Sequence, residues 1–313
     1  MQTIDPPQSK APGGYKSIFA PSTSRERKAN FEDYWKFDLE HSGEILEEER
    51  NLTKKKNKLA EFKENAVRSK NPLPDPEVFY RNYVHLEDDP KSFDRKTLLL
   101  TCIYKFARHE WVGITAAWDY LPELVRCKSL TDKISRYHIA EEFCHVRLFR
   151  EMFETCQLDR VEWVPLGKWM GRIYMLFPYV PEAIMAAPAF VTELMGITFY
   201  MHVDAMLDEV FHDEPEVAGR IRELLHEIMV DELAHIGQRR NFMGPISNWL
   251  ARRIITPLFK AFFADIPESK LLLDVNQMIK DAKVFDYSQV SQELMARTWV
   301  PSYCLETTAA PAT

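Results

Sequence analysis

Residues 137–147 read YHIAEEFCHVR, and residues 228–240 read IMVDELAHIGQRR. Each stretch holds a Glu-x-x-His motif directly preceded by a second acid: Glu141, Glu142 and His145 in the first, Asp231, Glu232 and His235 in the second. A Glu and a His three residues apart lie on one face of an α-helix. Two such helices can therefore direct all four side chains at one shared site, provided that both faces point inward.

The motif alone is weak, because Glu-x-x-His occurs four times, at 142/145, 209/212, 223/226 and 232/235. Each residue advances about 100° around a helix, so Glu223 and Glu232 point in opposite directions. The neighbours of Glu232 on its face are apolar: Ile221, Leu225, Ile228, Met229 and Ile236. Glu223 shares its face with polar residues, and Glu209 lies beside a turn. We therefore predict that only the motif of Glu232 points into a core on this helix.

The first motif has the same setting, with Glu142 flanked by Ile139, Val146, Phe149 and Phe153. An acid and a histidine within an apolar stripe are costly to bury without a partner. Either a metal ion or buried ion pairs and hydrogen bonds must compensate them.

Two further helices each offer one acid on an apolar face. Glu110 lies among Ile103, Phe106, Ala107 and Ile114, and Glu193 lies among Ala186, Ala189, Phe190, Gly196 and Ile197. Glu110 and Glu142 lie about ten and twelve residues from the turn between their helices, and Glu193 and Glu232 lie about eighteen from theirs. At about 1.5 Å per residue, the members of each pair meet at nearly the same height. Six residues thus converge, which favours metal binding.

Helical signals dominate the rest of the chain, and we predict an all-α fold. Ser92 is a candidate cap for a helix to about Tyr120, and Ser129 with Asp132 for one to about Cys156. A short crossover helix follows at 164–178, then helices from Pro181 to about Phe211 and from Pro215 to 243–245. This order predicts a four-helix bundle with one crossover connection and additional flanking helices.

We divide the chain into a disordered N-terminal tail (1–25), a charged helical extension (26–90), the bundle (91–244), flanking helices (245–304) and a disordered tail (305–313). The extension is interpreted as helices lying over the bundle, with a partner-binding arm as the alternative. The most apolar region, about 173–207, is interrupted by prolines and acids and is predicted to be buried helix rather than a membrane span.

Composition excludes several classes. A net charge of -7 gives no footprint for nucleic acid. The five cysteines are scattered, which argues against a disulfide scaffold and a cysteine-built iron–sulfur centre. The N-terminus has no apolar signal core, so a cytoplasmic protein without membrane contact is expected.

The pattern of Glu110, Glu142, His145, Glu193, Glu232 and His235 resembles the ferritin-like di-iron carboxylate superfamily, over roughly residues 92–243. That group includes ribonucleotide reductase small subunits, acyl desaturases, multicomponent hydroxylases and p-aminobenzoate N-oxygenases. The resemblance implies two Fe ions, or a Mn/Fe pair, with O2 as co-substrate. Glu110, Glu142 and His145 would hold one ion, and Glu193, Glu232 and His235 the other. Glu141 and Asp231 resemble residues that orient the ligand histidines.

One departure concerns a third histidine. The arylamine N-oxygenases carry it one turn before the last Glu, where this chain has Ile228. His138 instead lies one turn before Glu142, on the same face. It is either an extra metal ligand beside the first motif or a core histidine bonded to a ligand carboxylate, and the sequence leaves both open.

The resemblance implies an O2-dependent non-haem di-iron oxygenase or oxidase acting on a small or medium organic substrate by hydroxylation, N-oxygenation or oxidative C–H or C–C chemistry. The chain has no nucleotide-binding fingerprint, so an external reductase or ferredoxin, or the substrate itself, is expected to supply electrons. A homodimer is expected by resemblance only. The alternatives are a non-catalytic iron storage or sensing protein and a radical-generating metal subunit of a larger enzyme.

Substrate access and radical chemistry rest on a few residues. Small residues beside Glu193 (Ala189, Gly196) and Glu110 (Ala107, Gly113) indicate either an apolar pocket or close helix packing. Tyr200, two turns from Glu193, is either redox-active or an ordinary core residue.

Overall fold

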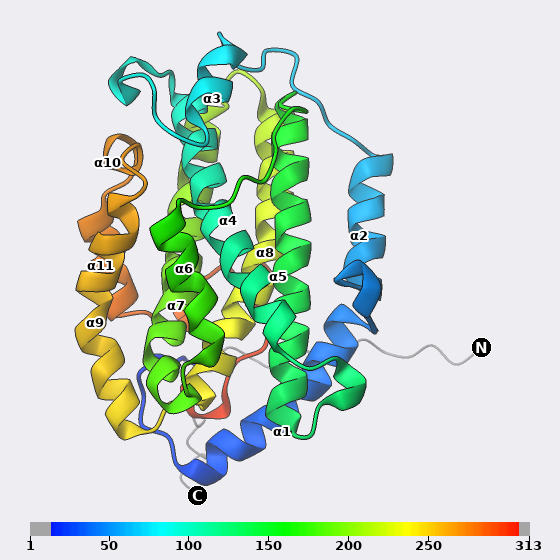
Figure 1. Ribbon diagram of the computed structural model, residues 1–313, viewed down its shortest axis with the longest axis vertical. Helices are drawn as coiled ribbons and strands as arrows, with labels where there is room; N and C mark the ends of the chain where they lie inside the picture. The colour runs from blue at the N-terminus through cyan, green and yellow to red at the C-terminus, as the bar shows by residue number, and fades with distance from the viewer. Residues whose placement is uncertain (1–13, 307–313) are drawn as a thin grey trace, which may run out of the picture.

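Four long helices form the centre of the computed structural model, which describes residues 14–306. They are α4 (Arg95–Tyr120), α5 (Leu130–Thr155), α7 (Glu182–Val210) and α8 (Pro215–Asn241). α4 packs on α5, α5 on α8, α8 on α7, and α7 in turn contacts α4 (Figure 1). The predictions of an all-α protein and of four long helices near these positions are confirmed.

Shorter elements surround these four. The N-terminal part contains α1 (Ser24–Ser42), β1 (Ile45–Leu46), β2 (Asn51–Leu52), α2 (Thr53–Glu64) and α3 (Pro76–Asn82), with β1 antiparallel to β2. The connection between α5 and α7 holds α6 (Lys168–Leu176) and the 3-10 turn η4 (Phe177–Tyr179). The C-terminal part contains α9 (Pro245–Ala264), α10 (Ser269–Leu272), α11 (Val275–Lys283) and α12 (Gln292–Met295). The remaining 3-10 turns are η1 (Glu47–Glu49), η2 (Pro90–Ser92), η3 (Leu124–Arg126), η5 (Tyr287–Gln289) and η6 (Ser302–Cys304).

Helix starts follow local capping chemistry. Ser129 and Asp132 form the predicted capping box at the start of α5. The cap of α4 is Asp94, whose carboxylate accepts from the Thr97 backbone N–H, and not Ser92, which lies in η2. Pro181 is the residue that precedes α7 and not a residue of its first turn. The cap of α4 is therefore Asp94, two residues after the predicted Ser92.

The apolar region at 173–207 divides in two. From Ala186 onward most of α7 is buried, as predicted. Before it, no residue of α6 is buried, and Leu176 and Ile184 are 63% and 62% exposed, so the prediction of buried helix is wrong there. α7 is the one helix in residues 14–306 long and apolar enough to cross a membrane by composition, and 61% of its apolar window is buried within the protein.

Both ends of the described chain are packed. Ile18 and Phe19 lie in the main core, and Tyr15 pairs with Leu305 across the termini. The predicted disorder is therefore wrong for residues 14–25 and for 305–306, because these apolar side chains find a surface to cover. Residues 1–13 and 307–313, also predicted to be disordered, lie outside the described residues.

The N-terminal helices lie over the bundle, as the main interpretation predicted. α1 packs across both α5 and α8, and α2 packs on α5. The inward side of α1 is polar rather than apolar: its buried residues are Asn30, Tyr34, Asp38 and Ser42. These residues recur every fourth position, so one stripe of α1 presents hydrogen-bonding groups to the core.

Candidate metal centre

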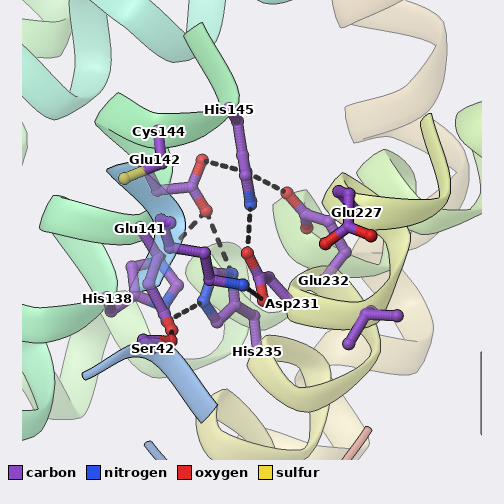
Figure 2. Close-up of polar contacts among 12 residues, drawn as sticks. Ser42, His138, Glu141, Glu142, Cys144, His145, Glu227, Asp231, Glu232 and His235 are labelled. Carbon is purple, nitrogen blue, oxygen red and sulfur yellow. Dashed lines mark hydrogen bonds and ion pairs between the residues drawn. The ribbon is translucent and has the colours of Figure 1, made fainter. Parts of the chain in front are cut away.

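The two Glu-x-x-His motifs meet between α5 and α8. Glu142, His145, Glu232 and His235 are each 5% exposed or less. Each histidine faces the carboxylate of the other helix: His145 Nδ1 lies 3.4 Å from Glu232 Oε1, and His235 Nδ1 lies 3.0 Å from Glu142 Oε1 (Figure 2). The predicted convergence of these four side chains is therefore present in the structure.

The ligand-type atoms form two groups in which all atoms lie within 4.8 Å of one another. One group contains His138, Glu142, Glu193 and His235, and the other contains Glu142, His145 and Glu232. Glu142 belongs to both. The division that the resemblance implied is therefore different in the structure: Glu232 lies with His145, and His138 lies with Glu193 and His235. The reason is that α5 and α8 pack directly together, so each Glu reaches across to the opposite histidine.

The acids before the motifs hold the two histidines. Glu141 Oε2 lies 2.8 Å from His235 Nε2, and Asp231 Oδ2 lies 3.0 Å from His145 Nε2. Each acid thus supports the histidine of the opposite helix. Because a carboxylate accepts, the Nε2 atoms must donate, which leaves each Nδ1 lone pair directed at the other carboxylates.

These Nδ1 atoms show that the centre needs a cation or protons. The Nδ1 atoms of His145 and His235, and Oε1 of Glu142, are buried without a hydrogen-bond partner among the described residues. Acceptors that face each other at 3.0–3.4 Å repel. A metal ion between them would satisfy all of these atoms, so this donor set fits one.

The pKa values of the buried histidine and carboxyl groups are raised, so these groups hold protons when no metal is bound. Burial would lower the pKa of His145, but Glu142 and Asp231 outweigh burial and hold it well above its ordinary value. Burial and the charge of Glu142 raise the pKa of Glu232 to about 8. Without metal, protons therefore occupy these groups near neutral pH, and metal binding must displace them.

Glu110 lies beside the two groups rather than within either. Burial, then the charges of Glu142 and Glu232, raise its pKa well above the ordinary value. Its Oε1 accepts a hydrogen bond from the Tyr200 hydroxyl, and its buried Oε2 has no partner among the described residues. Glu110 is thus close enough for the charges of Glu142 and Glu232 to raise its pKa, and it binds Tyr200. The resemblance implied that Glu110 holds an ion with Glu142 and His145, but in the structure it belongs to neither ligand group.

Glu193 and His138 lie beside each other in the group that also contains Glu142 and His235. His138 Nε2 lies 3.3 Å from Glu193 Oε1, and Arg239 Nε lies 3.3 Å from the same oxygen. The Glu193 side chain is 13% exposed, against 6% for that of Glu142. Burial lowers the pKa of His138 to about 4, which keeps its imidazole neutral. A neutral imidazole is the form that binds a metal.

The N-terminal helices complete the surroundings of the acids, a contact that the motifs of the sequence did not predict. Asp231 Oδ1 accepts from Lys55 Nζ at 2.5 Å and lies 2.9 Å from His41 Nε2. Glu141 accepts from the Ser42 hydroxyl. Asp38 is fully buried beside them, and burial followed by the charge of Glu141 raises its pKa. The four-residue spacing of polar residues on α1 was the one signal that could have revealed this role.

The two other Glu-x-x-His pairs are peripheral, as predicted. The side chains of Glu209 and Glu223 are 69% and 61% exposed and pair with arginines. His212 is exposed, and His226 faces Asp204. Helix position thus separates the central motifs from the peripheral ones.

The small residues next to the centre serve close packing. A Cβ at Gly196 would lie 3.4 Å from Glu232 Oε2 and 3.6 Å from the Tyr200 ring. A Cβ at Gly113 would lie 3.3 Å from the Tyr174 ring of α6. Of the two interpretations of these glycines, the structure favours packing over an open pocket.

Comparison with known proteins adds no relative: no family model, curated protein or solved structure matches this chain. The assignment of the centre therefore depends on its own geometry.

Proposed function

We propose that the protein is an O2-dependent non-haem di-iron oxygenase or oxidase built on a ferritin-like four-helix bundle. The observation that carries the proposal is the pair of buried ligand groups joined by Glu142, with both Nδ1 lone pairs directed inward. One group would hold one ion and the other group the second, with Glu142 between them. Glu110 and its partner Tyr200 would lie at the edge of the pair.

The donor set favours iron or manganese. The two groups together contain three glutamates and three histidines, and neither group contains a thiolate. The nearest cysteine in the motif, Cys144, is bonded to Asn51 and to the Ala140 carbonyl. Hard oxygen ligands with a few imidazoles suit Fe and Mn better than Zn or Cu.

In the proposed reaction, the metal and the residues of the chain have different roles. A bound iron pair would supply the reduction of O2 that oxidation of an organic substrate requires, with electrons from an external reductase or ferredoxin. The chain's own residues keep the centre dry, since every ligand candidate on α5 and α8 is buried. Asp231 and Glu141 fix the tautomers of the two histidines. Glu193, whose side chain is only partly buried, would mark the side on which a small organic substrate approaches.

Metal analysis tests the proposal. We expect about two Fe or Mn ions per chain in protein produced with both metals supplied, as in other two-metal bundles. Glu142→Ala should lose most of both ions, because Glu142 belongs to both groups, and Glu232→Ala should lose at least one. Glu223→Ala, on the exposed face of the same helix as Glu232, is the matched control and should keep both.

Two outcomes would count against the proposal. Wild-type protein that is folded and stable but contains no metal after production with both metals supplied would mean that the acids and histidines pair with each other. Metal-loaded protein that consumes no O2 with any reductant and organic substrate tested would favour the storage or sensing alternative.

A further inference from the structure

Large apolar side chains are exposed in three segments of the chain: 120–125 at the end of α4 and just after it, 169–184 through α6, η4 and the start of α7, and 246–250 at the start of α9. They are Tyr120, Val125, Trp169, Ile173, Met175, Leu176, Phe177, Tyr179, Ile184, Ile246, Trp249 and Leu250. Elsewhere in residues 14–306 only Leu39, Leu271 and Val284 are comparably exposed. Such a concentration is unusual for a surface without a binding role.

The three segments lie toward one end of the molecule. The Tyr120 and Tyr179 rings are 4.8 Å apart, which joins the first segment to the second. α9 packs beside α7, and both begin at the lower end in Figure 1, where η4 also lies. Phe19 connects the two helices, since it contacts the Phe190 ring of α7 and lies under Arg252 of α9. We call this surface the apolar end and define it as residues 120–128, 168–184 and 245–253, which include the residues directly beside the three segments.

The apolar end is basic, although the chain has a net charge of -7. Residues 120–128, 168–184 and 245–253 contain six cationic residues and two acids: Arg126, Lys128, Lys168, Arg172, Arg252 and Arg253 against Glu123 and Glu182. Both exposed tryptophans have an arginine over the ring, Arg172 at 5.7 Å from Trp169 and Arg253 at 5.3 Å from Trp249. Positive charge is therefore interleaved with the exposed aromatic rings.

We propose that the apolar end attaches the protein to the surface of an anionic lipid bilayer. Tryptophan and tyrosine favour the boundary between headgroups and acyl chains, aliphatic side chains enter it, and lysine and arginine attract anionic headgroups. All three kinds of residue are present here. This proposal reverses the expectation of no membrane contact, and it holds whether or not the centre carries iron.

Charge argues for a bilayer over a second copy of the chain. In a symmetric dimer through this surface, the same patch of each copy would face the other. The six basic residues of one copy would then meet the six of the other, and like charges repel. An anionic bilayer complements the same charges.

The candidate centre is far enough away to serve as a check on folding. Glu193 lies nine residues after Ile184 on α7, or about 13 Å at 1.5 Å per residue. Exchange of exposed residues on the apolar end should therefore leave metal content and thermal unfolding unchanged. This separates a failure of attachment from a failure of the proposed function.

Co-sedimentation of the full chain with vesicles tests the proposal. We expect binding to vesicles of phosphatidylcholine with phosphatidylserine, much weaker binding to phosphatidylcholine alone, and weakening by salt. Ile246→Ser with Trp249→Ser, at positions 81% and 58% exposed, should weaken binding by about tenfold or more. Arg172→Glu with Arg253→Glu should do the same through charge. Leu271→Ser with Val284→Ser, outside the apolar end, is the control and should bind like the wild type.

Several results would overturn the proposal. They are no sedimentation with either vesicle, equal sedimentation with both, or equal loss in the control variant. A dimer in analytical ultracentrifugation that dissociates in the Ile246→Ser, Trp249→Ser variant would assign the surface to a second copy instead.

Discussion

At the level of single residues, the acid that precedes each Glu-x-x-His motif holds a histidine in place. Glu141 and His145 are four residues apart on one helix, as are Asp231 and His235, yet each acid binds the histidine of the opposite helix. α5 and α8 are therefore joined by two reciprocal hydrogen bonds, one between the acid of each helix and the histidine of the other. They fix both imidazoles with Nε2 donating outward and Nδ1 available inward, which is the form that a metal requires.

His138 decides how many imidazoles the centre has. Its Nε2 lies with Glu193 and His235 in one ligand group and apart from His145. If it is a ligand, His138→Leu should lower metal content from about two ions per chain to about one, because the group around Glu142, His145 and Glu232 remains complete. Metal titration with elemental analysis of the loaded protein measures this.

His202→Leu is the control for His138. His202 lies on α7 and pairs with Asp281 at the surface, so its loss should leave both ions bound. Two ions of unchanged affinity in His138→Leu would instead show that His138 is a core histidine hydrogen-bonded to Glu193, the second interpretation of the sequence.

At the level of elements, α1 and α2 are part of the centre's support and not only a cover. Their side chains reach the two acids that hold the histidines: Ser42 binds Glu141, and Lys55 and His41 contact Asp231. A helix whose buried stripe is polar is stable only if its target is polar too. The extension therefore matches this bundle specifically, which disfavours the alternative of a free partner-binding arm.

Lys55 gives the sharpest test of that role. Its side chain is 8% exposed and its Nζ lies 2.5 Å from Asp231. Lys55→Met should lower the free energy of unfolding by about 3 kcal/mol, because it leaves a buried carboxylate without its nearest cation. Chemical denaturation of both proteins under identical conditions measures the difference.

Lys56→Met is the matched control on the same helix. Lys56 is 51% exposed and pairs with Glu49 at the surface, so its loss should cost no more than about 1 kcal/mol. Equal effects of the two substitutions would mean that α2 contributes nothing to the support of the centre.

Periodicity explains what the sequence could and could not predict. The four long helices and the inward faces of Glu142, Glu193 and Glu232 follow from local apolar patterns. The link between Lys55 and Asp231 joins residues 176 positions apart, and no local pattern specifies it. The pairing of each histidine with the opposite carboxylate was missed for a similar reason, since it depends on which helices are neighbours.

The exposed start of the long apolar region shows another limit. Residues 173–185 and the buried part of α7 are both rich in apolar residues, so a local apolar pattern could not separate them. Only the path of the chain, which leaves the bundle at α6 and enters it again along α7, places one stretch outside and the other inside.

For the whole molecule, the centre concentrates charge where most proteins place hydrocarbon. In the metal-free state, bound protons balance the negative charge of the buried carboxylates. Glu142 and Asp231 hold the pKa of His145 well above the ordinary 6.5, and Glu141 and Glu142 do so for His235. Burial and Glu142 raise the pKa of Glu232 from 4.5 to about 8. The metal-free fold therefore binds more protons than the unfolded chain between these pKa values.

This proton balance sets how stability changes with pH. A group whose pKa is raised on folding stabilises the fold below its unfolded pKa and loses that contribution as pH rises through the folded value. For Glu232 the loss runs from pH 4.5 to about 8, and for His145 and His235 it begins above pH 6.5. The metal-free protein should become less stable from pH 6 to pH 8, whereas bound metal replaces the protons and removes this loss.

Metal removal should therefore lower the melting temperature more at pH 8 than at pH 6. At saturating metal we expect a gap of about 10 °C between loaded and chelator-treated protein at pH 8, from about 4 kcal/mol of binding linkage and about 2–4 °C per kcal/mol. Differential scanning calorimetry of both forms at the two pH values measures it. Glu142→Ala, which lacks the carboxylate shared by both ligand groups, should show no gap at either pH. Two results would contradict this prediction: a difference in melting temperature that is larger at pH 6, or one that persists in Glu142→Ala. Either would mean that the stabilising metal binds elsewhere and that these buried groups balance their charges with protons alone.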